Sequence, residues 1–363
     1  MKKLGLAVLV LSILLCACRG ADISAPETTS KREVTVETFG TVPSSEPDIT
    51  ISETTEPILQ TETVTTTIEE EPEPEFIEEF EFPEEFYERM AALLEKYDLN
   101  EDCDGTLECT CAPEYEILDE EGNVVIPRKK SLSIYFYDIN SGFEYVLNPG
   151  AHYPIASTVK IPFCTLIYER IAAGEVDPET LLTYEERHYF EGTGEIVLGE
   201  FGQEYTVREL LNLAITISDN VAYEMLRDVL NWDDFSLYLT ENGCTHEQDV
   251  SRYKQKICSE SAGVYGKILA RFLRAGGEYA EMFKEDLLST RLKMLVSDYP
   301  IYRKYGWAGY SFHDIAYVDA PRPYILAVLS NLENEENADL VVFRDISRLI
   351  EEYCQAPAEQ ILS

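Results

Sequence analysis

Strand-like sequence occurs at two places far apart in the chain, and this separation most constrains the fold. Leu132 to Asp138 is rich in β-branched and aromatic residues and predicts a strand. Asn140-Ser141-Gly142 predicts a turn, after which Phe143 to Leu147 returns as the hairpin partner. Three more strands are predicted near the C-terminus, at 302–307, 314–319 and 324–329.

The sequence around and between these strands has the apolar spacing of helices. Two helices flank the strand groups, and six lie between them: 84–97, 340–353, 157–173, 206–217, 221–230, 233–242, 261–275 and 281–296. This order predicts an α+β fold, in which an antiparallel five-stranded sheet is flanked by the terminal helices and faced by an all-helical region.

The N-terminus has the features of an export signal. Lys2 and Lys3 precede an apolar run, Leu4 to Leu15, that is too short to span a membrane stably. The run ends in Leu15-Cys16-Ala17-Cys18, which resembles a bacterial lipoprotein signal cleaved before Cys18. We therefore predict a signal peptide at 1–17, a lipid on Cys18 and an extracytoplasmic protein anchored to the bacterial cell membrane. An ordinary secretory signal is the alternative.

Residues 18–75 are predicted to form a disordered, acidic tether. They are rich in Thr, Ser, Glu and Pro and contain few aromatic residues, so they cannot bury enough apolar surface to fold. Residues 76–363 are long enough for one large domain, which we expect to be monomeric. The net charge of the chain is -39, which argues against nucleic acid as a partner.

The cysteines and histidines indicate no metal or cofactor. Cys109-Thr110-Cys111 is too closely spaced for a usual zinc site. The four histidines, at 152, 188, 246 and 313, share no metal-like spacing. Without Cys16 and Cys18, seven cysteines remain, so at least one is unpaired if the others form disulfides. Pairing among Cys103, Cys109 and Cys111 is left open.

A candidate nucleophile lies at the start of a helical pattern, in Ser157-Thr158-Val159-Lys160. A hydroxyl attacks a carbonyl well only when a base removes its proton. At this spacing the two side chains lie one helical turn apart. Lys160 is flanked by apolar residues, and burial would lower its pKa enough for it to act as the base. The alternative is a helix-capping serine followed by a surface lysine.

Two further strings carry candidate site residues. Ser218-Asp219-Asn220 lies between two helical patterns, where Ser218 could pass a proton to the leaving nitrogen and Asn220 could bind a substrate amide. A simple helix N-cap is the alternative. Lys304-Tyr305-Gly306 lies in a predicted strand. Lys304 would hold a substrate carboxylate and support the low pKa of Lys160, and Gly306 would let a substrate backbone lie along the strand.

Together the three strings resemble the signature of class A β-lactamases and related penicillin-recognising serine hydrolases. The resemblance runs from about Glu84 to the C-terminus and includes the hairpin at 132–147 and the strand pair at 304–318. It implies an acyl-enzyme formed through Ser157. It also implies an oxyanion hole made by the backbone N–H groups of Ser157 and Trp307.

The sequence departs from this family in two ways. Class A enzymes have a Glu-x-x-Leu-Asn string whose glutamate activates the deacylating water, and none occurs between Asn220 and Lys304. Glu247 and Glu260 are the acidic residues near its expected place, and neither is followed by Leu-Asn. The acyl-enzyme is therefore expected to persist. Tyr305 also replaces a threonine that binds the substrate carboxylate in the family.

The sequence thus predicts a serine hydrolase acylated by β-lactams or by peptidoglycan-like peptides or esters. Its predicted catalytic residues are Ser157, Lys160 and Ser218, and its predicted substrate-binding residues are Asn220, Lys304, Tyr305, Gly306 and Trp307. The alternative is a catalytically silent module that binds peptidoglycan or a protein. The missing glutamate and the tether favour that alternative, whereas the complete set of motif residues favours an enzyme.

Overall fold

The structure is a computed structural model that describes residues 79–99, 130–246, 256–309, 311–332 and 339–356, and the backbone of 117–118 and 124–126. All of these residues belong to one compact unit, residues 71–363. The predicted signal peptide, Cys18, the tether and Glu247 lie outside the described residues.

The centre of the fold is a five-stranded antiparallel sheet in the order β4-β3-β11-β10-β9. The strands are β3 (Leu132–Asp138), β4 (Glu144–Leu147), β9 (Ile301–Trp307), β10 (Phe312–Val318) and β11 (Tyr324–Ser330). The N-terminal hairpin joins the C-terminal strands where β3 pairs with β11. The predicted sheet and its antiparallel pairing are therefore confirmed.

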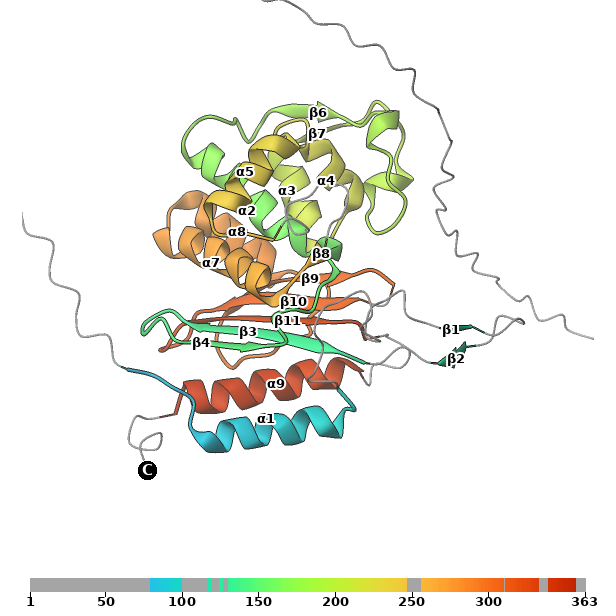
Figure 1. The fold of residues 1–363 in the computed structure, drawn as a ribbon. Helices are drawn as coiled ribbons and strands as arrows, with labels where there is room; N and C mark the ends of the chain where they lie inside the picture. Colours follow the sequence, from blue (N-terminus) through green and yellow to red (C-terminus); the bar gives the residue numbers. More distant parts are fainter. Residues whose placement is uncertain are drawn as a thin grey trace, which may run out of the picture. The chain divides into compact units, whose positions relative to one another are not determined.

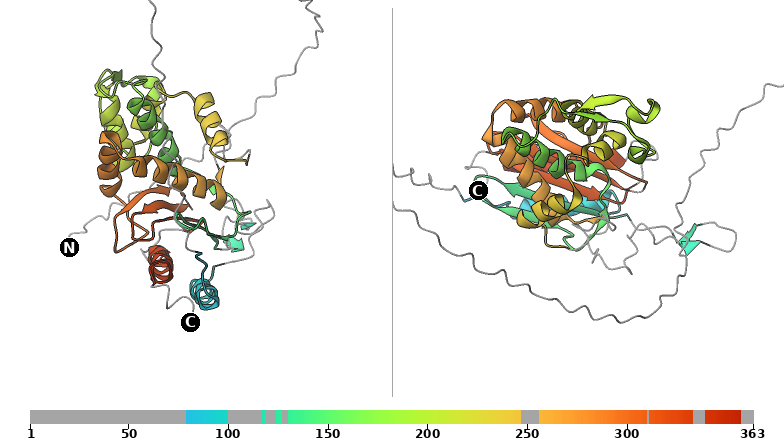
Figure 2. Two further views of the ribbon diagram at one scale, coloured as in Figure 1. Left: turned by 90° about the vertical axis from the view of Figure 1, so that its left-hand side faces the viewer. Right: turned by 90° about the horizontal axis from the view of Figure 1, so that it is seen from above.

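Helices cover both faces of this sheet (Figures 1 and 2). On one face lie the terminal helices α1 (Glu84–Lys96) and α9 (Asp339–Cys354), side by side. The other face carries the helical region: α2 (Lys160–Ala172), α3 (Val207–Thr216), α4 (Asn220–Leu226), α5 (Trp232–Glu241), α7 (Ser259–Ala275) and α8 (Glu278–Leu288). The expected α+β architecture is confirmed.

Each face of the sheet has its own apolar core. Because both faces are covered, every residue of β10 and β11 is buried. Helix α7 approaches the sheet closely at two glycines. A Cβ at Gly263 would collide with the ring of Tyr135, and one at Gly266 with the side chain of Ile325. This close packing fixes the helical region against the sheet, and the candidate site forms where the two meet.

Several short elements were not predicted. They include the two-residue pair β5 (Tyr153–Pro154) with β8 (Lys256–Ile257), and the pair β6 (Leu181–Thr183) with β7 (Glu204–Thr206). The chain also forms β1 (Ile117–Leu118), β2 (Val124–Ile126) and the 3₁₀ turns η1 (Ala156–Val159), η2 (Glu186–His188) and η3 (Ile196–Leu198). Among the described residues, no helix has both the length and the apolar character that crossing a membrane would require.

Three predicted helices differ from the structure, and the one predicted at 221–230 ends at Leu226. The helix predicted from Ser157 begins instead with the 3₁₀ turn η1, and α2 starts at Lys160. The helix predicted to end at Val296 ends at Leu288. Beyond it, Met294 and Leu295 are buried in the apolar core that contains residues of α1, α9 and the sheet, although they continue no helix. Their backbone N–H groups donate to Asp314 on β10. Their apolar spacing resembled a helical face by coincidence.

Candidate active site

The turn that carries Ser157 is anchored to the sheet. Ala156 has φ +49°, an unusual value for a residue with a side chain, at the point where the chain enters η1. On β10, His313 Nδ1 accepts from the N–H of Ser330 at 3.2 Å, so Nε2 carries the proton and donates to Pro154 O at 2.7 Å. Burial lowers the pKa of His313 to about 4, which keeps the ring neutral. His313 therefore positions the residues that lead to Ser157.

Lys160 is buried, with an exposed fraction of 2%, and its ammonium is surrounded by acceptors from the second string. Nζ donates to Ser218 O at 2.8 Å, Asn220 Oδ1 at 2.9 Å and Asp219 O at 3.2 Å, and lies 3.3 Å from Ser218 Oγ. Burial lowers the pKa of Lys160 to about 7, against the opposing effect of nearby Cys164, Asp219 and Glu224. A lysine with this pKa is partly neutral near pH 7 and can accept a proton.

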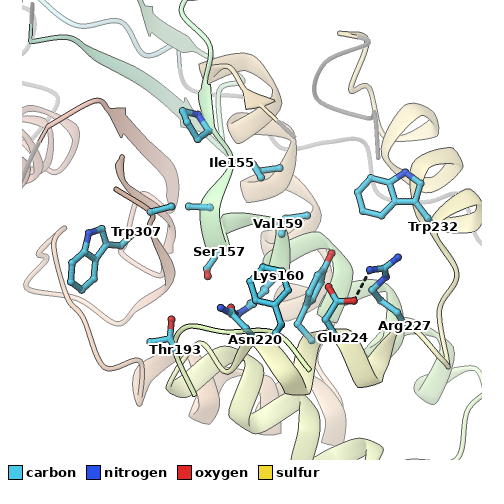
Figure 3. A pocket seen from close by; sticks show the side chains of 15 residues that line it. Ile155, Ser157, Val159, Lys160, Thr193, Asn220, Glu224, Arg227, Trp232 and Trp307 are labelled. Atoms are coloured by element: carbon cyan, nitrogen blue, oxygen red, sulfur yellow. Dashed lines mark hydrogen bonds and ion pairs between the residues drawn. The ribbon is translucent and has the colours of Figure 1, made fainter. Parts of the chain in front are cut away.

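Ser157 and Lys160 open into a cavity of about 600 Å³. Figure 3 shows Ser157, Lys160, Asn220 and Thr193 converging there, with Trp307 and Trp232 at opposite sides. The lining is completed by Pro154, Ile155, Ala156, Val159, Phe190, Tyr223, Glu224, Arg227 and Ala308. The first two predicted strings and the predicted residue Trp307 are thus brought together.

In Ser218-Asp219-Asn220, Asp219 is a helix N-cap, while the roles of Ser218 and Asn220 toward a substrate stay predictions. Asp219 is the N-cap of α4 and accepts from the N–H of Ala222 at 2.9 Å. Its other oxygen accepts from the N–H groups of Glu195 and Ile196 at 2.7 and 3.0 Å. Held on either side of this cap, Ser218 and Asn220 contact Lys160.

Lys304 does not line the cavity. Its side chain is fully buried, and Nζ donates to Tyr305 O at 3.0 Å and lies 3.8 Å from the centre of the Tyr305 ring. Burial, and then repulsion from Lys160, holds the pKa of Lys304 well below its usual value. Burial is the main cause of the lowered pKa of Lys160, as expected from its apolar neighbours, and the further support that the sequence assigned to Lys304 is not among the causes. The contact of Lys304 with a substrate carboxylate stays a prediction.

Tyr305 is also buried and lies against Ser218, not at the cavity surface. Burial raises the pKa of Tyr305, and a hydrogen bond with the Ser218 side chain partly offsets this rise. Ser218 therefore lies between the Lys160 amine and the Tyr305 phenol. The contact of Tyr305 with substrate stays a prediction.

Gly306 makes room for the nucleophile turn. A Cβ at this position would lie 2.9 Å from Thr158 Cγ2 and 3.2 Å from Ala156 Cβ. His313, which anchors the same turn, is the direct partner of Gly306 across β9 and β10. The space into which a side chain would project is filled by η1, so the packing of the nucleophile turn already accounts for glycine here. A substrate backbone lying along β9 stays a prediction.

Gly306→Ala is therefore expected to disturb Ser157. Pushing η1 away should slow acylation by about 10- to 100-fold. It should also cost about 1–3 kcal/mol of folding free energy through overpacking. Measured rates of acylation and thermal unfolding test this. Thr158→Ser removes the methyl group that the new Cβ would meet, so the double variant should recover part of both losses. Equal rates for Gly306→Ala and the original chain would contradict the steric argument.

Sequence reasoning missed the segment that carries Phe190 and Thr193. Thr193 O accepts from the N–H of Asn220 at 2.9 Å. The flanking glycines have φ values of +135° (Gly192) and +137° (Gly194). A Cβ at Gly192 would lie 2.7 Å from Asn220 Nδ2, and one at Gly194 would overlap the Asp219 carboxylate. The Gly-x-Gly spacing was the available signal for this close approach.

The acidic residue in the cavity is not one of those considered from the sequence. Glu260 is exposed and bonds His246 at 3.0 Å, away from the cavity. Among the residues that line the cavity, Glu224 supplies the one carboxylate, and it pairs with Arg227 at 2.6 Å (Figure 3). Helix α4 therefore places a carboxylate in the same cavity as Ser157.

Comparisons with known proteins agree with the fold. PBP-A has a TM-score of 0.54 and 19% identity, with 61% of this chain and 89% of that chain covered. A β-lactamase from Sphaerobacter thermophilus has a TM-score of 0.55 and 20% identity, covering 62% and 91%. An ancestral class A β-lactamase has a TM-score of 0.55 and 17% identity, covering 74% and 99%. These similarities show the fold.

Sequence comparison adds the family. No curated protein sequence matches the chain. Residues 119–354, however, match the sequence pattern described as the "Beta-lactamase enzyme family". This match includes Ser157-Thr158-Val159-Lys160, Ser218-Asp219-Asn220 and strand β9 with Gly306. Because it covers more than half of the 363 residues, the chain belongs to the β-lactamase enzyme family.

Proposed function

We propose that the chain is a serine hydrolase that forms an acyl-enzyme through Ser157. The observation that carries this proposal is the buried Lys160 in the same cavity as Ser157, with a pKa lowered to about 7. A neutral amine in that position can take the hydroxyl proton as Ser157 attacks a carbonyl. A surface lysine, with its usual pKa, would be charged and could not act as a base near neutral pH.

In the proposed acylation step, Ser157 Oγ forms a bond to the carbonyl carbon and its proton passes to Lys160. The carbonyl C–N bond then breaks. Ser218 Oγ, 3.3 Å from Lys160 Nζ, would pass a proton to the leaving nitrogen and be reprotonated from Lys160. Water later cleaves the ester, which returns Ser157 and releases the acid. Ser157, Lys160 and Ser218, which carry out these steps, all belong to the described site.

We further propose β-lactams or cell-wall-type peptides and esters as the substrate class. A mutant of PBP-A, which shares the fold, has been solved as an acyl-enzyme complex with penicillin G. The cavity of this chain suits a substrate with apolar groups around a polar reacting centre, since Trp307 and Trp232 lie on either side of Ser157 (Figure 3). The predicted signal peptide and Cys18 support an extracytoplasmic location for this activity.

Deacylation is proposed to be slow. Glu224 is the carboxylate among the cavity-lining residues, and its Oε2 accepts from Arg227 at 2.6 Å. The sequence also has no Glu-x-x-Leu-Asn string between Asn220 and Lys304, which in class A enzymes supplies the base that activates the deacylating water. The acyl-enzyme should then outlast the acylation step.

Intact-mass spectrometry of the full-length chain after incubation with benzylpenicillin tests the proposal. The expected result is one added penicillin mass per chain that persists after the free drug is removed, and that maps to the peptide containing Ser157. An adduct that disappears quickly while the drug is consumed would support the acyl-enzyme but refute slow deacylation. No adduct and no consumption, with benzylpenicillin and with peptide or ester substrates alike, would overturn the proposal in favour of a silent binding module.

A further inference from the structure

Three side chains of the types that can bind a metal ion converge outside the cavity. The ligand atoms of His152, His246 and Cys258 all lie within 4.8 Å of one another. Imidazole nitrogens together with a thiolate form a ligand set that suits zinc. In the sequence these residues are 94 and 12 positions apart, so no local spacing revealed them.

The fold builds this cluster from three separate segments. His152 directly precedes β5, and Cys258 directly follows β8. The two strands pair with Tyr153 opposite Ile257, so the next position of the antiparallel register puts His152 opposite Cys258. His246 comes from the segment that follows α5. The cluster therefore joins the strand pair beside the nucleophile turn to the end of α5.

Both imidazoles are oriented as metal ligands usually are. His152 Nδ1 lies 3.0 Å from Gly150 O, and His246 Nε2 lies 3.0 Å from Glu260 Oε2. Metal-bound histidines commonly donate one ring N–H to a carbonyl or carboxylate, which leaves the other nitrogen for the metal. His152 Nε2 and the side chain of Cys258 are buried, and the two rings pack edge to face at 5.4 Å.

Contacts with neighbouring side chains, without a metal ion, account for only part of the cluster. The His246–Glu260 contact is an ordinary side-chain hydrogen bond, and Cys258 Sγ lies 3.6 Å from Ser261 Oγ. Neither contact explains why a second imidazole and a buried thiol face the same point. One bound ion would explain the convergence of all three ligand atoms and the orientation of both rings.

We propose that His152 Nε2, His246 Nδ1 and the Cys258 thiolate bind one Zn²⁺, with water in the fourth position. Zn²⁺ replaces the thiol proton, which is released to solvent. Zinc lies about 2.0–2.3 Å from nitrogen and sulfur ligands, so the ligand atoms would move together by roughly 1 Å on binding. The ion would stabilise the segment that ends at Ser157, five residues after His152. This inference does not depend on the proposed hydrolase activity.

Zinc binding by the full-length chain tests the site. The cysteines outside the described residues are first replaced by serine, so that they cannot bind metal: Cys16, Cys18, Cys103, Cys109 and Cys111. After equilibration with Zn²⁺ and removal of the excess, elemental analysis should find one zinc per chain. Co²⁺ in its place should give a thiolate-to-metal charge-transfer absorption band. Zinc should also raise the midpoint of thermal unfolding.

Variants assign the ligands. Cys258→Ser and His246→Gln should each lose the stoichiometric zinc, the cobalt–thiolate band and the thermal shift. Cys354→Ser, which changes another buried thiol on α9 across the sheet, should retain all three. His246 is partly exposed, so its variant remains informative if Cys258→Ser fails to fold. No stoichiometric zinc in the parent chain, or equal zinc in the His246→Gln and parent chains, would overturn the proposal.

Discussion

Ser157→Ala is expected to abolish covalent labelling by penicillin. The bond in the proposed acyl-enzyme is made by Ser157 Oγ, and alanine has no atom to replace it. Removing a serine nucleophile typically lowers the rate by at least about a thousandfold, which puts labelling below detection. The side chain is only partly buried, so the variant should fold like the original chain. Intact mass and thermal unfolding measured on the same sample separate loss of chemistry from loss of structure.

The chain provides a matched control for this substitution. Ser251-Arg252-Tyr253-Lys254 is its other Ser-x-x-Lys string, and it lies outside the described residues. Ser251→Ala should be labelled to the same extent and at the same rate as the original chain. Labelling that survives in Ser157→Ala would show that another nucleophile forms the adduct, and the assignment of Ser157 would be wrong.

Much of the fold could be predicted because its main elements have strong local patterns. Leu132–Asp138 was predicted with the bounds that the structure gives. Helix bounds were predicted wrongly where apolar residues are buried in a segment that is not a helix. Met294 and Leu295 are buried beneath β10 in an irregular segment, so they resembled part of a helix. Pairs as short as β5 and β8 contain too few residues to show a period at all.

The site was predictable where a string places its residues close together. Ser157 and Lys160 are three positions apart, and their chemistry follows from that spacing. Contacts between distant segments left only weak signals. Thr193 enters the cavity because Gly192 and Gly194 allow a close approach to Asn220, and the sequence does not name that partner. The space beside Gly306 was likewise not predictable, because η1 fills it only through the packing of β9 on the nucleophile turn.

The rate of acylation should depend on pH through Lys160. Burial lowers the pKa of Lys160 to about 7, so the fraction in the neutral, basic form grows as the pH rises towards that value. Below pH 7 the rate constant should rise about tenfold per pH unit, and above about pH 8 it should level off. Stopped-flow or quenched-flow acylation by a chromogenic β-lactam between pH 5 and 9 measures this profile. A flat profile would exclude a lysine base with this pKa.

Variants must separate Lys160 from Lys304, because burial lowers the pKa of both. Lys160→Met should slow acylation by about 100- to 10,000-fold, the usual contribution of a general base. Lys96→Met, on the exposed surface of α1, should leave the rate and the profile unchanged. Lys304→Met should slow the reaction but keep the inflection near pH 7. If the inflection disappears in Lys304→Met while that variant still acylates, Lys304 carries the titration and Lys160 is not the base.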